Sequence, residues 1–226
     1  MLFNLSQKKL VFASLFSAAI LILLTWLVKT SPALQNFDNQ ALAFFAQARC
    51  PFSNAFFRAI TFLGDEKTLI TTTVLLSVVF YFYKKMAYYV LFIGMMIGSS
   101  AFVYLLKDFV MRPRPSLIAP VITETSASFP SGHAALSVVF YGLIAYLFAR
   151  RSKNEQTQKN IAAVWILVFI LIGSSRLHLG VHFVSDVIAG YATGFFWLSL
   201  GILLFEQLIS EETPWWKKCW NKMKQR

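Results

Sequence analysis

The sequence predicts an all-α polytopic membrane protein whose helices form one membrane domain over residues 1–226. Hydrophobic residues make up 57% of the chain and charged residues 14%, and the mean hydropathy is +0.60. This composition is too apolar for an ordinary soluble domain. The apolar residues form six long runs, each a candidate transmembrane helix. Neither an internal repeat nor a change in composition marks a second domain.

The first apolar run, residues 10–28, follows Lys8 and Lys9 and is long enough to cross the hydrocarbon core of a bilayer. A signal peptide is the alternative interpretation. The run is long for the apolar part of a signal peptide, and the polar segment 29–32 that follows is a poor cleavage site. We therefore expect a first span that the protein retains.

Residues 31–65 mix aromatic and polar side chains and are interrupted by Pro32, Pro51 and Gly64. This pattern predicts one or two short interfacial helices between the first and second spans, although short helices packed on the core would give the same pattern. The other five apolar runs cover residues 68–83, 86–106, 133–148, 161–174 and 187–205. Several are shorter than the about 20 residues of a typical span, so we expect their helices to extend into flanking polar residues.

The net charge of +11 comes from short basic clusters between the apolar runs, which is unlike the continuous basic face of a nucleic-acid-binding protein. These clusters are Lys8-Lys9, Lys84-Lys85, Arg150-Arg151 with Lys153 and Lys159, and the C-terminal tail. With six spans they all lie on one side, which predicts that both termini are cytoplasmic. The tail segment 214–220 is rich in tryptophan and lysine and predicts an interfacial anchor. Cys50 and Cys219 then lie on opposite sides of the membrane, which excludes a disulfide bond between them.

The outward loops after the third and fifth spans contain the unusual polar residues. Lys107, Arg112 and Arg114 place three cations at an outward-facing membrane edge, where the positive-inside rule disfavours them. Snorkelling side chains are one explanation. Bound phosphate is the better one, because arginine offers a planar fork of donors and lysine a point charge.

A second stretch of interest begins the fourth span. Pro130 and Ser131 fit the start of a helix, and Gly132 lets an anion approach first-turn N–H groups that have no helical partner. A plain helix start explains these residues equally well when they stand alone. The stretch also contains His133, and all three histidines of the chain lie in these outward stretches.

The third stretch contains Arg176, His182 and Asp186. At positions i and i+4 of a helix, His182 and Asp186 share a face, so the carboxylate can hold one ring N–H while the other nitrogen stays free as a nucleophile. Alone, such a pair is commonly a surface cap. Beside the cations of the other stretches, it predicts a phosphoryl-transfer site.

A zinc site formed by His133, His178 and His182 is an alternative. The neighbouring arginines and lysine would repel a divalent cation, whereas they suit a phosphate group. We therefore predict no metal, and we interpret His178 as a structural residue or as part of the substrate rim.

The order and spacing of these residues resemble the three-part signature of the type 2 phosphatidic acid phosphatase superfamily. This superfamily includes bacterial membrane lipid phosphatases and shares its site with vanadium-dependent haloperoxidases. The match lies within residues 107–186: Lys107 to Arg114-Pro115, then Pro130-Ser131-Gly132-His133, then Ser175-Arg176 to His182 and Asp186. Val184 and His178 depart from residues that are frequent in the family, but neither takes part in the proposed chemistry.

The resemblance implies a role for each residue of the signature and implies no metal or cofactor. His182 would be the nucleophile that forms a phosphohistidine, Asp186 would hold its ring, and His133 would protonate the leaving group and then activate water. The groups that bind the phosphate oxygens would be Lys107, Arg114, Arg176, the Ser131 hydroxyl and the Gly132 backbone N–H.

These expectations describe a lipid phosphatase of the bacterial plasma membrane with its site on the extracytoplasmic face. Undecaprenyl diphosphate and phosphatidylglycerophosphate are the favoured substrates, and phosphatidate and a phosphorylated lipid A are the other options. The segments 31–65 and 116–128, the second with Glu124, would shape selectivity. A phosphotransferase with the same intermediate and a non-enzymatic carrier of anionic lipids are the alternatives, whereas the spans exclude a soluble haloperoxidase. The sequence does not indicate which oligomeric state the protein adopts.

Overall fold

The computed structural model describes residues 6–83 and 86–211. Eight helices and no β-strand occur in this part of the chain. The helices are α1 (Gln7–Thr30), α2 (Pro32–Gln47), α3 (Pro51–Phe62), α4 (Glu66–Phe82), α5 (Met86–Val110), α6 (Gly132–Arg151), α7 (Glu155–His178) and α8 (Val184–Glu211). The predicted basic pair Lys84-Lys85 and the tail segment 214–220 with Cys219 lie outside the described residues.

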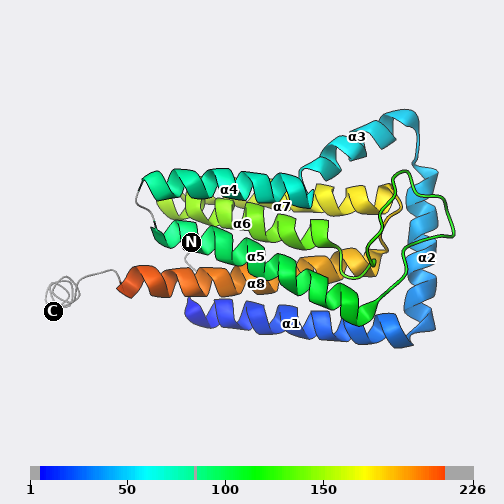
Figure 1. The fold of residues 1–226 in the computed structure, drawn as a ribbon, viewed down its shortest axis with the longest axis horizontal. Helices are drawn as coiled ribbons and strands as arrows, with labels where there is room; N and C mark the ends of the chain where they lie inside the picture. The colour runs from blue at the N-terminus through cyan, green and yellow to red at the C-terminus, as the bar shows by residue number, and fades with distance from the viewer. Residues whose placement is uncertain (1–5, 84–85, 212–226) are drawn as a thin grey trace, which may run out of the picture.

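Helices α1 and α4 to α8 run side by side in a bundle, and α2 crosses one end of that bundle (Figure 1). Among the described residues, five helices are long and apolar enough to cross a membrane, namely α1, α5, α6, α7 and α8. Helix α4 has only 17 residues and is not one of them. The all-helical membrane fold is thus confirmed, and the sixth span stays a prediction.

The segment between α1 and α4 forms two short helices, as predicted. The hydroxyl of Ser31 caps α2 by accepting from the Leu34 N–H at 3.2 Å, and Pro32 occupies the first turn, where its missing N–H costs nothing. Pro51 begins α3 in the same way. Phe44 on α2 and Phe52 on α3 are largely exposed. The position of these helices in the membrane interface stays a prediction.

Several helices are longer than their apolar runs, which confirms the predicted extension into polar residues. Helix α7 covers Glu155–His178, whereas its apolar run covers only 161–174. Its start is set by Asn154, whose side-chain oxygen accepts from the Gln156 N–H at 2.8 Å. The extensions place Lys107 in the last turn of α5 and Arg176 in the last turn of α7.

Helices α6 and α8 pack closely at the end of the bundle where α2 lies. Gly190 on α8 permits this approach, because a Cβ at this position would lie 2.8 Å from the Cβ of Ala134 on α6. The N–H of Ser131 also donates to the backbone oxygen of Asp186 at 3.0 Å. The start of α6 is therefore fixed against the start of α8.

Candidate active site

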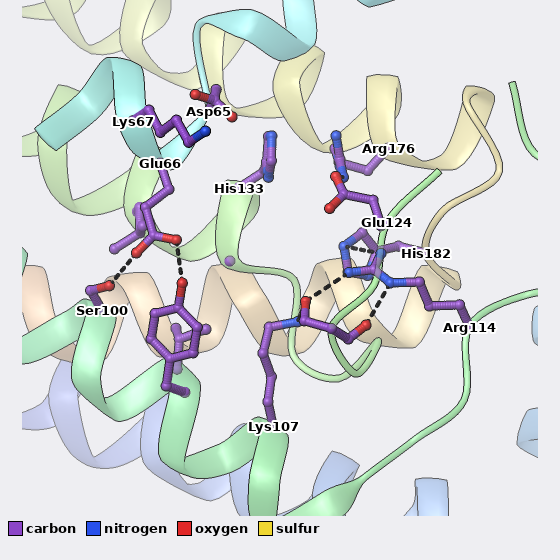
Figure 2. Close-up of a pocket in the computed structure, with 15 residues that line it drawn as sticks. Asp65, Glu66, Lys67, Ser100, Lys107, Arg114, Glu124, His133, Arg176 and His182 are labelled. Carbon is purple, nitrogen blue, oxygen red and sulfur yellow. Dashed lines mark hydrogen bonds and ion pairs between the residues drawn. The ribbon is translucent and has the colours of Figure 1, made fainter. Parts of the chain in front are cut away.

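The three predicted stretches meet at this end of the bundle, around a cavity of about 180 Å³ (Figure 2). The last turns of α5 and α7, the first turn of α6 and two connecting loops contribute to its wall. Its charged and histidine lining residues are Asp65, Glu66, Lys67, Lys107, Arg114, Glu124, His133, Arg176 and His182. Six of the eight predicted site residues line the cavity; the six are Lys107, Arg114, Gly132, His133, Arg176 and His182.

Lys107 and Arg114 are held by the loop between α5 and α6. The Lys107 ammonium donates to the Ala127 carbonyl, and the Arg114 guanidinium donates through Nε to the Ser126 carbonyl at 2.7 Å. Nη1 of Arg114 donates to the Val181 carbonyl at 2.7 Å. These contacts fix the positions of two cations on one wall of the cavity, so an anion that enters finds them already oriented.

Arg176 is almost fully buried, with 1% of its surface exposed. Nη1 donates to the Thr61 hydroxyl at 2.9 Å, and Nη2 forms an ion pair with Glu124. Burial acts to raise the pKa of Glu124, but the hydrogen bond and charge of Arg176 outweigh it and hold that pKa below its usual value. Glu124 is therefore ionised at neutral pH and occupies one donor of Arg176.

His182 lies in the loop before α8, which begins at Val184, so the prediction that His182 stands on a helix is wrong. The predicted contact still forms, with Nδ1 of His182 3.5 Å from Oδ2 of Asp186. Burial lowers the pKa of His182 to about 4, and the hydrogen bond with Asp186 opposes this effect only in part. At neutral pH the imidazole is therefore neutral.

The other ring nitrogen of His182, Nε2, lies 3.3 Å from Nη1 of Arg114. With a proton on Nδ1, directed at Asp186, Nε2 is the acceptor in this contact, because a guanidinium can only donate. A neutral ring whose unprotonated nitrogen faces a cation-lined cavity is the state that a nucleophile requires.

Asp186 lies outside the cavity lining, where its two carboxylate oxygens are fully buried. Oδ1 accepts from Arg112 at 2.6 Å, and Oδ2 accepts from the Ser128 hydroxyl at 2.5 Å and from the Phe183 N–H at 2.9 Å. The sequence indicated no partner for Asp186 other than His182. Arg112 was visible as one of three clustered cations, but the signature assigns a role to Arg114 and none to Arg112.

Of the predicted site residues at the start of α6, two line the cavity and one does not. Figure 2 shows His133 projecting into the cavity from the first turn of α6. Gly132 also lines the cavity, whereas Ser131 is fully buried and does not. The Ser131 hydroxyl caps α6 by accepting from the Ala134 N–H, so its predicted contact with phosphate is not preformed.

His178 lies away from the cavity wall. Its ring lies 4.4 Å from the ring of Phe57, and its Nε2 is 3.0 Å from the side-chain oxygen of Asn54. Across the described ranges, no group of three or more His, Cys, Asp or Glu side chains is placed to hold a metal ion. The structure therefore does not bring the three histidines together as the zinc alternative requires.

The turn between α3 and α4 forms a wall of the cavity that sequence reasoning missed. Asp65 caps α4, and Glu66 accepts from the Ser100 hydroxyl and the Tyr104 hydroxyl on α5, both at 2.6 Å. These bonds join α4 to α5 beside the cavity. An acidic residue just before an apolar run was the available signal, but it is common at the starts of helices.

The fold and the cavity define a helical membrane protein with a buried, cation-lined site at the ends of its helices. Residues 88–210 match the family model of the PAP2 superfamily, and because the match covers more than half of the chain, the chain belongs to this superfamily. The predicted family is confirmed, and with it the predicted class of enzyme, the phosphatases that act on lipid phosphates.

Two curated relatives are informative. Phosphatidylglycerophosphatase B of Bacillus subtilis (strain 168) is 34% identical over 178 residues, which cover 76% of this chain and 82% of that protein. Lipid A 1-phosphatase of Rhizobium johnstonii is 33% identical over 131 residues, which cover 52% of this chain and 49% of the relative.

Two solved structures share the fold. A transmembrane PAP2-type phosphatidylglycerolphosphate phosphatase from Bacillus subtilis has a TM-score of 0.78 and 26% identity, over 87% of this chain and 97% of that chain. LpxE of Aquifex aeolicus has a TM-score of 0.57 and 23% identity, over 72% and 93%, and supports the fold alone.

Proposed function

We propose that this chain is a metal-independent lipid phosphatase of the bacterial plasma membrane that works through a phosphohistidine intermediate. The observation that carries the proposal is the environment of His182. One ring nitrogen faces the buried Asp186, and the other lies beside Arg114 in a cavity that Lys107 and Arg176 also line. This arrangement supplies a neutral nucleophile and three cations for the oxygens of one phosphate group.

In the first step, the lone pair of Nε2 attacks the phosphorus atom, and the bond from phosphorus to the lipid oxygen breaks. The departing oxygen takes a proton from His133, which enters this step as the imidazolium and leaves it neutral. In the second step, neutral His133 takes a proton from water as the water oxygen attacks the phosphorus of phospho-His182. The P–N bond then breaks, inorganic phosphate leaves, and both histidines return to their starting states.

The cations act where charge is redistributed during transfer. Lys107, Arg114 and Arg176 bind the non-bridging oxygens, together with the Gly132 N–H at the start of α6. The Ser131 hydroxyl can donate to phosphate while its oxygen still accepts from the helix, so the same side chain can serve as cap and ligand.

A groove beside the cavity supports a lipid as the substrate. This groove lies between α4 and α5, has a volume of about 440 Å³ and is lined almost entirely by apolar side chains. Ser100 lines both the groove and the cavity. A lipid whose phosphate lies in the cavity can therefore place a hydrocarbon chain in the groove.

Phosphatidylglycerophosphate is the substrate that we favour, because the relative that covers most of the chain acts on it by name. Undecaprenyl diphosphate is the second choice.

In the proposed topology α4 also crosses the membrane, which brings the number of spans to six. Both termini lie in the cytoplasm, and the cavity lies on the extracytoplasmic face. The described basic clusters support it, because Lys8-Lys9 begin α1, Arg150-Arg151 end α6, and Lys159 lies in the first turns of α7. These helix ends lie opposite the end that contains the cavity (Figure 1). The positive-inside rule then directs the cavity outward.

Phosphate release by the purified protein in detergent, with EDTA present, tests the proposal. The substrates are phosphatidylglycerophosphate, undecaprenyl diphosphate, phosphatidate and a lipid A, and the variants are His182→Ala and, as a matched control outside the cavity, His178→Gln. We expect release from at least one lipid by the wild type and the control, and none by His182→Ala. Release by His182→Ala, or a requirement for metal, would contradict the mechanism. Transfer of labelled phosphate to a second lipid instead of water would identify a phosphotransferase, and binding without transfer would identify a carrier.

A further inference from the structure

A buried charge network lies beside His182, outside the cavity lining. Its charged members are Asp38 on α2, Arg112 after α5 and Asp186 in the first turn of α8. The Ser185 hydroxyl lies among them, and the Gln35 side-chain oxygen on α2 accepts from Nη2 of Arg112 at 3.1 Å. The side chains of Arg112 and Asp38 are 5% and 0% exposed. Buried charges cost free energy unless they are paired, and apolar side chains would often fill the same space at lower cost. The network therefore calls for a functional reason.

Arg112 stands between two carboxylates. Its Nη1 donates to Oδ1 of Asp186 at 2.6 Å, and its Nη2 donates to Oδ2 of Asp38 at 2.8 Å. Its Cζ lies 4.2 Å from the centre of the ring of Phe183, the residue that follows His182. Two ion pairs and a ring face fix both the position and the plane of the guanidinium.

Asp38 also binds the start of α8 directly. Its Oδ1 accepts from the Ser185 N–H at 3.0 Å, and its Oδ2 accepts from the Ser185 hydroxyl. The first N–H groups of a helix have no partner within that helix, so Asp38 caps α8 from α2. Because Asp186 lies in this same turn, Asp38 holds it both through the backbone and through Arg112.

The charges of the network matter for the chemistry of His182. A carboxylate that is paired fully with one guanidinium attracts a second cation more weakly. Because Asp38 offsets part of the positive charge of Arg112, Arg112 neutralises Asp186 less fully. Asp186 therefore attracts a positively charged imidazole more strongly. The need is greatest after phosphoryl transfer, because a ring with phosphorus on Nε2 and a proton on Nδ1 is cationic.

We propose that Asp38 and Arg112 are positioning residues of the active site, which together fix Asp186 and preserve its negative charge opposite His182. This inference rests on the proposed function, because it concerns the same histidine. It assigns α2, the helix across the end of the bundle, a part in the reaction although none of its residues lines the cavity.

Asp38→Asn keeps the shape of the side chain and removes its charge, so it is the primary test. We expect kcat for lipid phosphate release, measured per folded protein, to fall about tenfold to a hundredfold, the range for losing one charge-assisted hydrogen bond. KM should not change, because Asp38 does not touch the cavity. Asp108→Asn, the same change on the exposed face of α5, is the matched control and should leave both constants unchanged.

A double-variant comparison tests whether Asp38 acts through Arg112. In Asp38→Asn with Arg112→Gln, the loss of kcat should be smaller than the product of the two single losses, because both changes disable the same unit. A product of independent losses would overturn the proposal. So would a folded Asp38→Asn protein with wild-type kcat, or one in which KM rises in parallel with the loss of kcat.

Folding and the proposed function are tested separately. If Asp38→Asn does not yield folded protein, Ser185→Ala decides, because it removes only the hydroxyl between Arg112 and Asp38; a severalfold loss of kcat supports the proposal and an unchanged kcat overturns it. The wild type and His182→Ala are compared first. If phosphate release does not depend on His182, it is the proposed function that fails, before any network variant is measured.

Discussion

Replacing Asp186 by asparagine should slow the enzyme severely without changing the shape of the site. Oδ2 of Asp186 lies 3.5 Å from Nδ1 of His182, and the two side chains are 0% and 2% exposed. At this separation, opposite unit charges attract by about 4.7 kcal/mol with an effective dielectric constant of about 20. Because the phosphorylated imidazole of the proposed mechanism would be cationic, loss of this attraction should lower kcat by a factor of roughly 3000.

The amide also has no orientation that suits its neighbours. If its oxygen replaces Oδ1, which accepts from Arg112 at 2.6 Å, its NH₂ group faces the Phe183 N–H and His182. If its oxygen replaces Oδ2, the NH₂ group faces the guanidinium. The first orientation also favours the wrong tautomer of His182, with the proton on the nitrogen that should attack.

Steady-state phosphate release at saturating lipid substrate in detergent measures this effect, with Asp108→Asn as the control for an exposed aspartate. Elution volume and melting temperature establish that the variant is folded. A folded Asp186→Asn protein that keeps more than about a tenth of the wild-type kcat would refute the electrostatic role of Asp186.

Three further changes probe the cavity and its surroundings. Glu124→Gln should tighten inhibition by vanadate about tenfold, because removal of ~1.4 kcal/mol of repulsion leaves Arg176 free for the anion; a weaker or unchanged inhibition constant would contradict this. Burial lowers the pKa of His182 to about 4, whereas the unfolded ring has a pKa of about 6.5, so the ring gains a proton on unfolding between these values. The free energy of unfolding should therefore be roughly 3 kcal/mol lower at pH 4 than above pH 6.5. Stability should therefore fall as pH falls through this window, and His182→Gln should show a smaller fall in denaturant titrations. Ala101→Trp should fill the groove between α4 and α5 and raise KM for a long-chain lipid but not for a soluble phosphate ester; equal effects on both would remove the groove from the binding site.

The helical bundle was predictable because its signals are local. An apolar run predicts a span, and a cap such as Asn154 sets where the span begins. Helix α4 shows the limit of this reasoning. Its apolar run is short, and what joins it to α5 near the cavity is the pair of bonds from Glu66 to Ser100 and Tyr104. Those bonds link residues 34 and 38 positions apart, and composition and periodicity do not report such pairs.

The candidate site was predictable where residue type and spacing alone point to chemistry. Lys107, Arg176 and His182 all lie within a turn of a helix end, so a bundle with helices of similar length brings them together. Asp38 was not predictable, because it lies in a helix of ordinary polar and apolar residues. Its partner Arg112 is 74 positions away, and only the crossing of α2 over the end of the bundle brings them together.

Charge balance explains why the cavity can hold several cations before substrate arrives. Arg176 is buried, and an unpaired buried guanidinium would be costly, so Glu124 supplies a counter-charge from the loop between α5 and α6. The pairing is incomplete, because Nε of Arg176 is buried with no hydrogen-bond partner among the described residues. A phosphate oxygen that bound there would satisfy this donor, and the phosphate charge would repel Glu124 from Nη2. Under the proposed function, binding of the substrate phosphate would therefore displace Glu124, and one anion would replace another at Arg176.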